Sequence, residues 1–230
     1  MRRTALAALC VFALSSLARA ENLSGEVDFT GAPPTPARLH READPVCAKK
    51  EGFDESVLVK NGKLANVWVH VVSGAPDSQA PAGAPAVTVD QSDCTYHPRV
   101  QAAQVGQKLV AKNSDATLHN VHAYQGSTTV FNKGMANASA KPIEQPLDKD
   151  GVVKLKCDVH SWMRGYVGVN KNPYQAVTGD DGAFKIELPP GTYTVEAWHE
   201  KLGVKSAQVV VAAGKPAQLT FKYDGTEKAN

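Results

Sequence analysis

Long apolar runs are scarce in this 230-residue sequence, and so are clusters of one charge. Beyond residue 20, no stretch approaches the roughly 18 uninterrupted apolar residues that a membrane-spanning helix needs. Lysine and arginine number 25 against 23 aspartates and glutamates, and they form no basic cluster. A nucleic-acid-binding protein needs such a cluster to neutralise phosphates. The sequence therefore predicts no membrane span and no nucleic-acid partner.

The apparent positive charge belongs to the first twenty residues. Arg2 and Arg3 precede an apolar run, and "ARA" before Glu21 has the small residues of an export cleavage site. Residues 1–20 are therefore predicted to be a signal peptide, which places the mature protein in the periplasm. The three arginines of this segment account for the formal charge of +2, so the remainder carries −1.

A convincing apolar repeat of 3.6 residues is also lacking, which argues against long helices. Short runs rich in Val, Thr, Tyr and Phe dominate instead, and Gly, Pro, Asn or Asp bound them. The sequence therefore predicts an all-β fold. The predicted strands are residues 25–30, 56–60, 66–72, 86–90, 107–113, 119–124, 151–157, 165–170, 183–188, 192–198, 206–212 and 217–223.

Two composition changes divide the mature chain. Residues 76–87 are rich in Pro, Ala and Gly and predict a linker. The segment "VTGDDGAFKIELPPGTYTVEAWH" near the C-terminus resembles a carboxypeptidase regulatory-like domain, a small transthyretin-like β-sandwich. This resemblance implies that residues 21–75 and 171–230 form one sandwich, with residues 88–170 inserted as a second domain. Two domains simply in series remain the alternative.

Cysteine and methionine are few, yet the seven-residue segment "CDVHSWM" contains one of each. Cys157, His160 and Met163 are spaced three apart between two predicted strands, so a loop can bring them around one point. A thiolate, two imidazoles and a weak axial thioether are the ligands of a mononuclear blue-copper site. The second imidazole must come from "HNVHAY", where His119 and His122 point to opposite faces because their spacing is odd.

The two motifs together resemble the cupredoxin family of blue copper proteins, in its amicyanin and plastocyanin-like branch. Greek-key β-sandwich architecture over residues 88–170 and one copper ion follow from that resemblance. It also implies that the copper ligands are His119, Cys157, His160 and Met163. Further implied roles are Asn120 as the residue tying two loops together near the sulfur, and an exposed ring edge of His160, beside Trp162, as the electron exit.

Two features depart from the family pattern. Asp158 puts a carboxylate beside the cysteine ligand, and Trp162 replaces a smaller aromatic residue. The combination with a regulatory-like sandwich resembles exported proteins called methylamine-utilisation proteins.

The remaining cysteines of the mature chain, Cys47 and Cys94, have no ligand-type neighbours at short spacing. We expect them to form a disulfide that joins the N-terminal segment to the inserted domain. Closing this loop contributes about 3 to 4 kcal/mol in the chain-entropy account of disulfides.

These observations favour a periplasmic one-electron carrier whose partner is a redox protein such as a c-type cytochrome or a periplasmic oxidoreductase. The alternative is a copper-delivery or copper-sensing protein that docks to a cell-envelope complex through the regulatory-like sandwich. An enzyme is not expected, because the sequence offers no nucleophile–base pair, carboxylate dyad or open three-histidine copper site.

Overall fold

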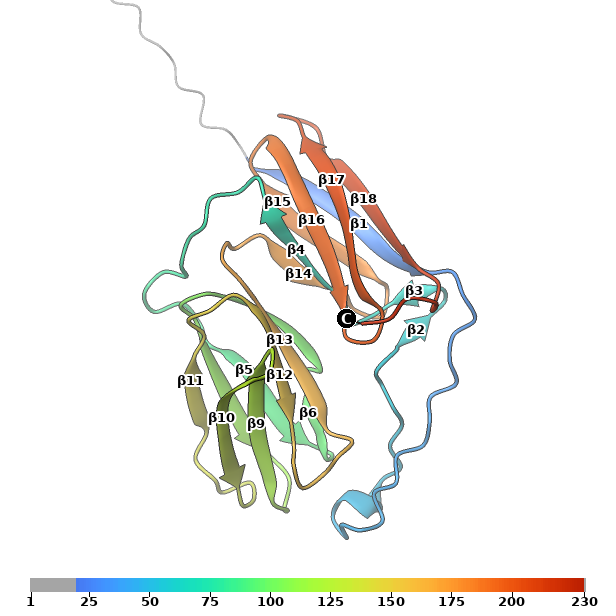
Figure 1. Ribbon diagram of the computed structural model, residues 1–230, viewed down its shortest axis with the longest axis vertical. Helices are drawn as coiled ribbons and strands as arrows, with labels where there is room; N and C mark the ends of the chain where they lie inside the picture. The colour runs from blue at the N-terminus through green and yellow to red at the C-terminus, as the bar shows by residue number, and fades with distance from the viewer. Residues whose placement is uncertain (1–19, 230) are drawn as a thin grey trace, which may run out of the picture.

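The structure is a computed structural model that describes residues 20–229 (Figure 1). It is all-β, as predicted, with 18 strands and a single short 3-10 helix, η1 (Cys47–Lys49), in the described residues. The predicted signal peptide lies outside them except for its last residue. No helix in the described part of the chain has the length and apolar character required to cross a membrane.

The strands form two β-sandwiches, one above the other in Figure 1. The first sandwich combines strands from both ends of the described chain. One of its sheets contains β1 (Glu21–Phe29), β2 (Val59–Lys60), β3 (Lys63–Leu64), β15 (Ala183–Leu188) and β18 (Ala217–Tyr223). The other contains β4 (Trp68–Ser73), β14 (Gln175–Val177), β16 (Gly191–His199) and β17 (Gly203–Val211).

The second sandwich uses only strands from the middle of the chain. One sheet has the order β10 (Thr128–Met135), β9 (His119–Gln125), β12 (Gly151–Lys156), β13 (Arg164–Asn170) and β7 (Val100–Gln104). The other has the order β11 (Ile143–Pro146), β8 (Lys108–Asn113), β5 (Val87–Ser92) and β6 (Thr95–His97).

Alternating side chains explain why these segments pair as half-buried strands. In β15 and β16, every second residue is buried, as a strand with one face toward a core requires. Each sandwich has its own apolar core: the first includes Leu23, Phe184 and Val195, and the second includes Val121, Leu155 and Val167. Two separate cores mean that each sandwich buries its own sheet faces.

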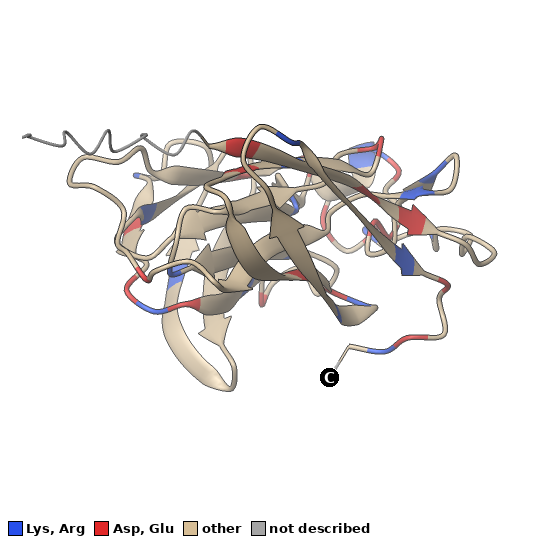
Figure 2. Cartoon of the chain, turned by 90° about the horizontal axis from the view of Figure 1, so that it is seen from above, with Lys and Arg blue, Asp and Glu red and all other residues tan. Residues whose placement is uncertain are grey.

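The sandwiches are also fixed to each other. Trp68 of β4 belongs to a smaller apolar cluster with Val100 and Tyr166 of the second sandwich. Beside it, the Arg99 guanidinium donates to both carboxylate oxygens of Glu200, at 2.5 and 2.9 Å, and both side chains are largely buried. Elsewhere acidic and basic residues are interspersed, as Figure 2 shows from above.

One segment of the first sandwich reaches the second. Between β1 and β2 the chain forms a long excursion that carries η1, and Figure 1 shows it running down beside the lower sandwich. An antiparallel bridge between Arg38 and Phe53 closes the base of residues 38–53, which we call the strap. Its cysteine, Cys47, forms the expected disulfide with Cys94 in the turn between β5 and β6.

Candidate metal centre

Three of the predicted ligands meet at one end of the second sandwich. His119 begins β9, Cys157 follows β12, and His160 lies in the loop from β12 to β13. Strands β9 and β12 are antiparallel neighbours, so the start of one lies beside the end of the other. One donor atom from each residue can be chosen such that all three lie within 4.8 Å of one another, and all three side chains are buried.

The two imidazoles face each other through their Nδ1 atoms, which are 2.9 Å apart. The Cys157 sulfur lies 3.9 Å from Nδ1 of His160. The strand periodicity also behaves as expected, because His122 is directed to the other face, where it bonds Asp158, Thr129 and Tyr124. The structure therefore brings His119, and not His122, to the cysteine.

Met163 closes the loop that carries Cys157 and His160. Its amide donates to the His160 carbonyl at 3.0 Å, and its carbonyl accepts from the Cys157 amide at 3.4 Å. The Met163 side chain is fully buried in the same apolar cluster as Cys157. The other methionine of the described chain, Met135, is engaged elsewhere, because its sulfur accepts from Gln91 at 3.2 Å.

Asn120 connects the start of β9 to the loop that carries Cys157. Its backbone amide donates to the Cys157 sulfur at 3.5 Å, and its side-chain oxygen lies 3.3 Å from that sulfur. The same oxygen accepts from the Asp158 amide at 2.7 Å, and the Asn120 amide nitrogen donates to the Asp158 carboxylate. The Cys157 thiol is thus enclosed by fixed polar groups and is free of any disulfide.

The Asp158 carboxylate is held by side chains of the neighbouring strands β9, β10 and β12. Lys156 pairs with one oxygen at 2.9 Å, while His122 and Asn132 bond the other. The hydrogen bond from Lys156 is the largest of the effects that hold the pKa of Asp158 well below its usual range. Asp158 is therefore a charged partner of these strands at neutral pH.

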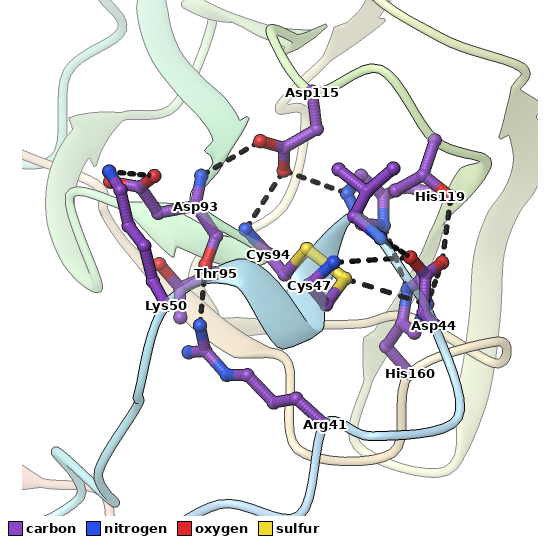
Figure 3. Close-up of a disulfide and its surroundings, with 12 residues drawn as sticks. Arg41, Asp44, Cys47, Lys50, Asp93, Cys94, Thr95, Asp115, His119 and His160 are labelled. Atoms are coloured by element: carbon purple, nitrogen blue, oxygen red, sulfur yellow. Dashed lines mark hydrogen bonds and ion pairs between the residues drawn. A yellow bond between two sulfur atoms is a disulfide. The ribbon is translucent and has the colours of Figure 1, made fainter.

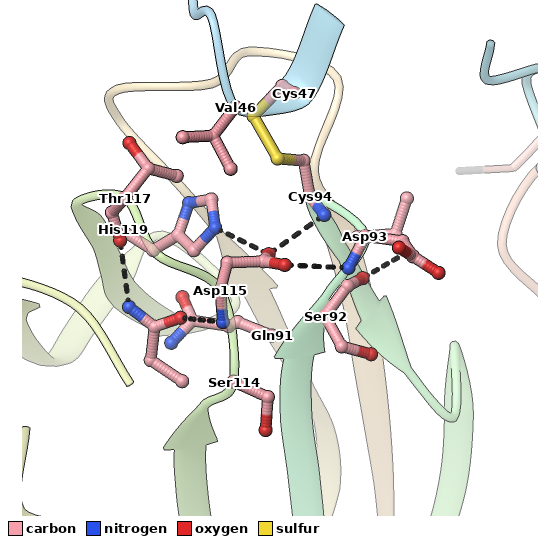
Figure 4. Close-up of polar contacts among 12 residues, drawn as sticks. Val46, Cys47, Gln91, Ser92, Asp93, Cys94, Ser114, Asp115, Thr117 and His119 are labelled. Atoms are coloured by element: carbon pink, nitrogen blue, oxygen red, sulfur yellow. Dashed lines mark hydrogen bonds and ion pairs between the residues drawn. A yellow bond between two sulfur atoms is a disulfide. The ribbon is translucent and has the colours of Figure 1, made fainter. Parts of the chain in front are cut away.

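Two aspartates that the sequence did not single out hold the outer nitrogens of the histidines. Asp115 accepts from Nε2 of His119 at 2.9 Å, and the same carboxylate accepts from the amides of Asp93 and Cys94 (Figure 4). Asp44 of the strap lies 3.0 Å from Nε2 of His160 (Figure 3). Each carboxylate therefore touches one imidazole and the backbone beside one half of the disulfide.

These contacts influence the ionisation of His119 and of Asp44. Burial lowers the pKa of His119, with the hydrogen bond to Asp115 opposing that effect. Partial burial raises the pKa of Asp44, but hydrogen bonds from Thr117, the strap amides and His160 outweigh it and bring the pKa to about 2. Asp44 is therefore ionised at neutral pH and accepts hydrogen bonds only.

The surroundings of His160 correct one expectation. An exposed ring edge was predicted, but His160 is only 3% exposed because the strap covers it. Besides Asp44, the Cys47 sulfur lies 3.8 Å from Nε2 of His160. Trp162 is half-buried, and its indole donates to the Cys94 carbonyl at 2.9 Å. Sequence reasoning missed this cover because the approach of the strap depends on tertiary structure, although the disulfide hinted at it.

The donor set fits a copper ion. A neutral imidazole carries one proton, so a ring that donates from Nε2 has a lone pair at Nδ1. With both Nε2 atoms directed at carboxylates, the two Nδ1 lone pairs face each other at 2.9 Å. A cation between them and the thiolate relieves their repulsion. Carboxylate–histidine–metal arrangements of this kind are usual around protein-bound metals.

Comparisons with known proteins add only a limited likeness. No protein-family model and no curated protein matches the chain. An amicyanin mutant in its reduced state is similar to 44% of this chain and 98% of its own, with 24% identity and a TM-score of 0.34. A purple cupredoxin from Nitrosopumilus maritimus is similar to 36% of this chain and 99% of its own, with 21% identity and a TM-score of 0.32. The functional assignment therefore depends on the donor atoms themselves.

Proposed function

We propose that this chain is a periplasmic mononuclear copper protein of the cupredoxin type and carries single electrons. The convergence of His119, Cys157 and His160 in one buried cluster is the observation that supports it most. One thiolate with two imidazoles is a donor set that suits copper, and a thioether from Met163 would complete it. The thioether disfavours zinc, for which it is a poor ligand.

Bound copper supplies the one-electron chemistry, and the residues of the chain supply a fixed coordination shell. His119 and Cys157 come from neighbouring strands, and Asn120 ties the strand start to the cysteine loop. The backbone bonds between Cys157, His160 and Met163 hold the loop in one conformation. A shell that changes little between oxidised and reduced copper suits rapid electron transfer.

The packing of the four proposed ligands supports a carrier over an enzyme, because all four side chains are buried. None of the five main cavities among residues 20–229 is lined by His119, Cys157, His160 or Met163. The largest, about 620 Å³, lies between the N-terminal segment that follows β1 and the C-terminal tail. A catalytic copper site needs an open position for substrate, and these ligands are packed in a core.

Two exposed apolar side chains adjoin the ligands and suit a redox partner. Leu118 precedes His119 and is 48% exposed, and Val159 precedes His160 and is 52% exposed. Brief electron-transfer encounters use small contact areas, so two apolar side chains beside the ligands are enough to anchor a redox partner. The proposed partner is a c-type cytochrome or a periplasmic oxidoreductase.

Copper delivery or sensing is the second candidate, and the strap favours it. The first sandwich, proposed to be a regulatory-like docking module, touches His160 through Asp44. Docking of that sandwich at a cell-envelope complex would therefore reach the copper ligand directly. Fold alone does not decide between the two functions.

Potentiometric titration of copper-loaded protein distinguishes the electron carrier from the delivery or sensing protein. A carrier gives one reversible one-electron transition with the same spectrum after repeated cycles. Tight copper(I) binding with no reversible oxidation would favour delivery and contradict the carrier.

The partner contact has its own test. We expect Val159→Lys to slow electron exchange with a c-type cytochrome without altering the absorption spectrum, because only the anchor changes. Val210→Lys on the first sandwich, where Val210 is 68% exposed, is the matched control. Equal rates of electron exchange for the two variants would mean that the partner docks elsewhere.

A further inference from the structure

Three contacts fasten the strap to the turn between β5 and β6 of the second sandwich. Cys47 forms the disulfide with Cys94, and the Lys50 ammonium pairs with the Asp93 carboxylate at 2.5 Å. The Arg41 guanidinium donates to the Asp93 carbonyl at 2.9 Å. Figure 3 shows these contacts around the disulfide. The strap tip is therefore held at the metal end of a sandwich to which it does not belong.

Asp44 occupies the centre of that tip and divides its two oxygens between two tasks. Oδ1 accepts from the amides of Val46 and Cys47, at 2.7 and 3.1 Å, and so forms the turn that leads to the disulfide. Oδ2 accepts from the Thr117 hydroxyl at 2.7 Å and from Nε2 of His160 at 3.0 Å. One side chain thus braces the strap and touches a predicted ligand.

We propose that Asp44, delivered by the strap of the first sandwich, is a positioning residue for His160 that fixes its tautomer, orientation and burial. The inference rests on the proposed function, since it concerns the ligand role of His160. Asp115 does the same for His119 from within the second sandwich, four residues before it. Asp44 differs because it comes from the other sandwich, so the first sandwich acts on the metal centre.

The expected direction of the effect follows from charge. A carboxylate that accepts from Nε2–H raises the basicity of Nδ1, and its negative charge favours the more positive copper(II) state. Loss of such a partner typically costs about 10- to 100-fold in metal affinity. A tenfold loss for copper(II) alone raises the one-electron reduction potential by about 59 mV.

Asp44→Asn is the decisive substitution because an amide has only one acceptor oxygen. That oxygen can accept from the strap amides or from His160, whereas the carboxylate does both. If it stays on the strap turn, the amide NH₂ group faces the Nε2–H group, and two donors oppose each other. We expect a higher reduction potential and faster solvent exchange of the His160 Nε2 proton.

Glu42→Gln is the matched control, since it removes the same charge from the same strap. Glu42 is exposed and pairs with Arg38, with no contact to His160. A second variant, Cys47→Ser with Cys94→Ser, removes the disulfide that holds the strap tip and leaves Asp44 itself unchanged. We expect it to shift the potential in the same direction as Asp44→Asn, and the triple variant to add little beyond either.

Two readouts separate this inference from the proposed function. Potentials are measured on copper-loaded protein, and ¹⁵N-histidine NMR on metal-free protein reports the Nε2 proton of His160. If wild-type protein binds no copper, the proposed function fails, while the NMR comparison still tests the Asp44 contact. If copper binds but Asp44→Asn matches Glu42→Gln in potential and in NMR, the positioning role is wrong and the copper assignment stands. A cysteine double variant with the wild-type potential would refute a need for the disulfide in placing Asp44.

Discussion

Buried histidines dominate the chemistry of this chain at the scale of single residues. His119 and His160 face the cysteine, whereas His70 and His199 are buried in the first sandwich. His70 is stacked on Trp68, with 3.6 Å between ring centroids, and Nδ1 of His199 accepts from the amides of Lys201 and Leu202. Among the described residues, His70 and His199 belong to no group of three ligand-type side chains that could hold a metal. Their burial is therefore the property that matters for stability.

Burial of His70 and His199 predicts a pH-dependent stability. Desolvation lowers the pKa of each to about 4, with nearby Arg99 adding to the effect at His199. Unfolded histidine takes up a proton near pH 6.5, so the unfolded state binds more protons between pH 6.5 and 4. The free energy of unfolding therefore falls as the pH drops through this window, by at most about 3 kcal/mol per histidine.

Urea unfolding of metal-free protein at several pH values between 7 and 4 measures this slope. We expect the variant with His70→Gln and His199→Gln to lose much of the slope. His40→Gln should keep it, because the His40 side chain is exposed. Equal slopes in all three proteins would show that these two histidines do not control acid stability.

Residue types and strand periodicity predict much of the candidate site from the sequence alone. The spacing of Cys157, His160 and Met163 predicts a common loop, and the odd spacing of His119 and His122 predicts that only one faces the sulfur. Asp44 could not be assigned, since its contact with His160 spans 116 positions and depends on how the strap folds. Burial of the His160 edge was missed for the same reason.

At the scale of elements, alternation of apolar residues identifies strands with one face in a core. All twelve predicted strands overlap observed ones, among them β9 and β12, which carry the ends that meet at the site. Six observed strands had no predicted counterpart: β3, β6, β7, β10, β11 and β14. Five of them have at most five residues, and the eight-residue β10 buries only Phe131 and Met135. These segments become strands because neighbouring strands pair with them, and the pairing partners cannot be read from a single sequence.

The strap shows the same limit in a longer segment. From Thr30 to Leu58 the chain has no named strand, and only η1 and one bridge interrupt it. Its position depends on contacts with the other sandwich, chiefly the disulfide and the ion pair of Lys50 with Asp93. Sequence reasoning gave the disulfide but not the surface against which the strap lies.

At the scale of the whole molecule, the two sandwiches are joined by an apolar cluster around Trp68. Gly168 of β13 lies under the Trp68 ring, and an added Cβ would be 2.2 Å from Cδ2 of that ring. The residue at this position must therefore be glycine for β13 and β4 to approach each other this closely. The buried pair of Arg99 and Glu200 lies at the same junction.

Gly168→Ala tests that junction. We expect it to lower the free energy of unfolding by about 1 to 3 kcal/mol, as overpacking of a filled core does. Tryptophan fluorescence should change with it, because Trp68 must move. Gly134→Ala in β10 is the control, since nothing lies within 4 Å of its added Cβ. Equal stability of the two variants would mean that the sandwiches are not tightly packed there.

The proposed function depends on one thiolate binding copper in the second sandwich. The most direct measurement is the absorption and paramagnetic-resonance spectrum of copper-loaded protein, compared with that of Cys157→Ser. We predict an intense visible band from thiolate-to-copper charge transfer in the wild-type protein and its disappearance in the variant. A wild-type protein without that band, or a variant that keeps it, would contradict the assignment.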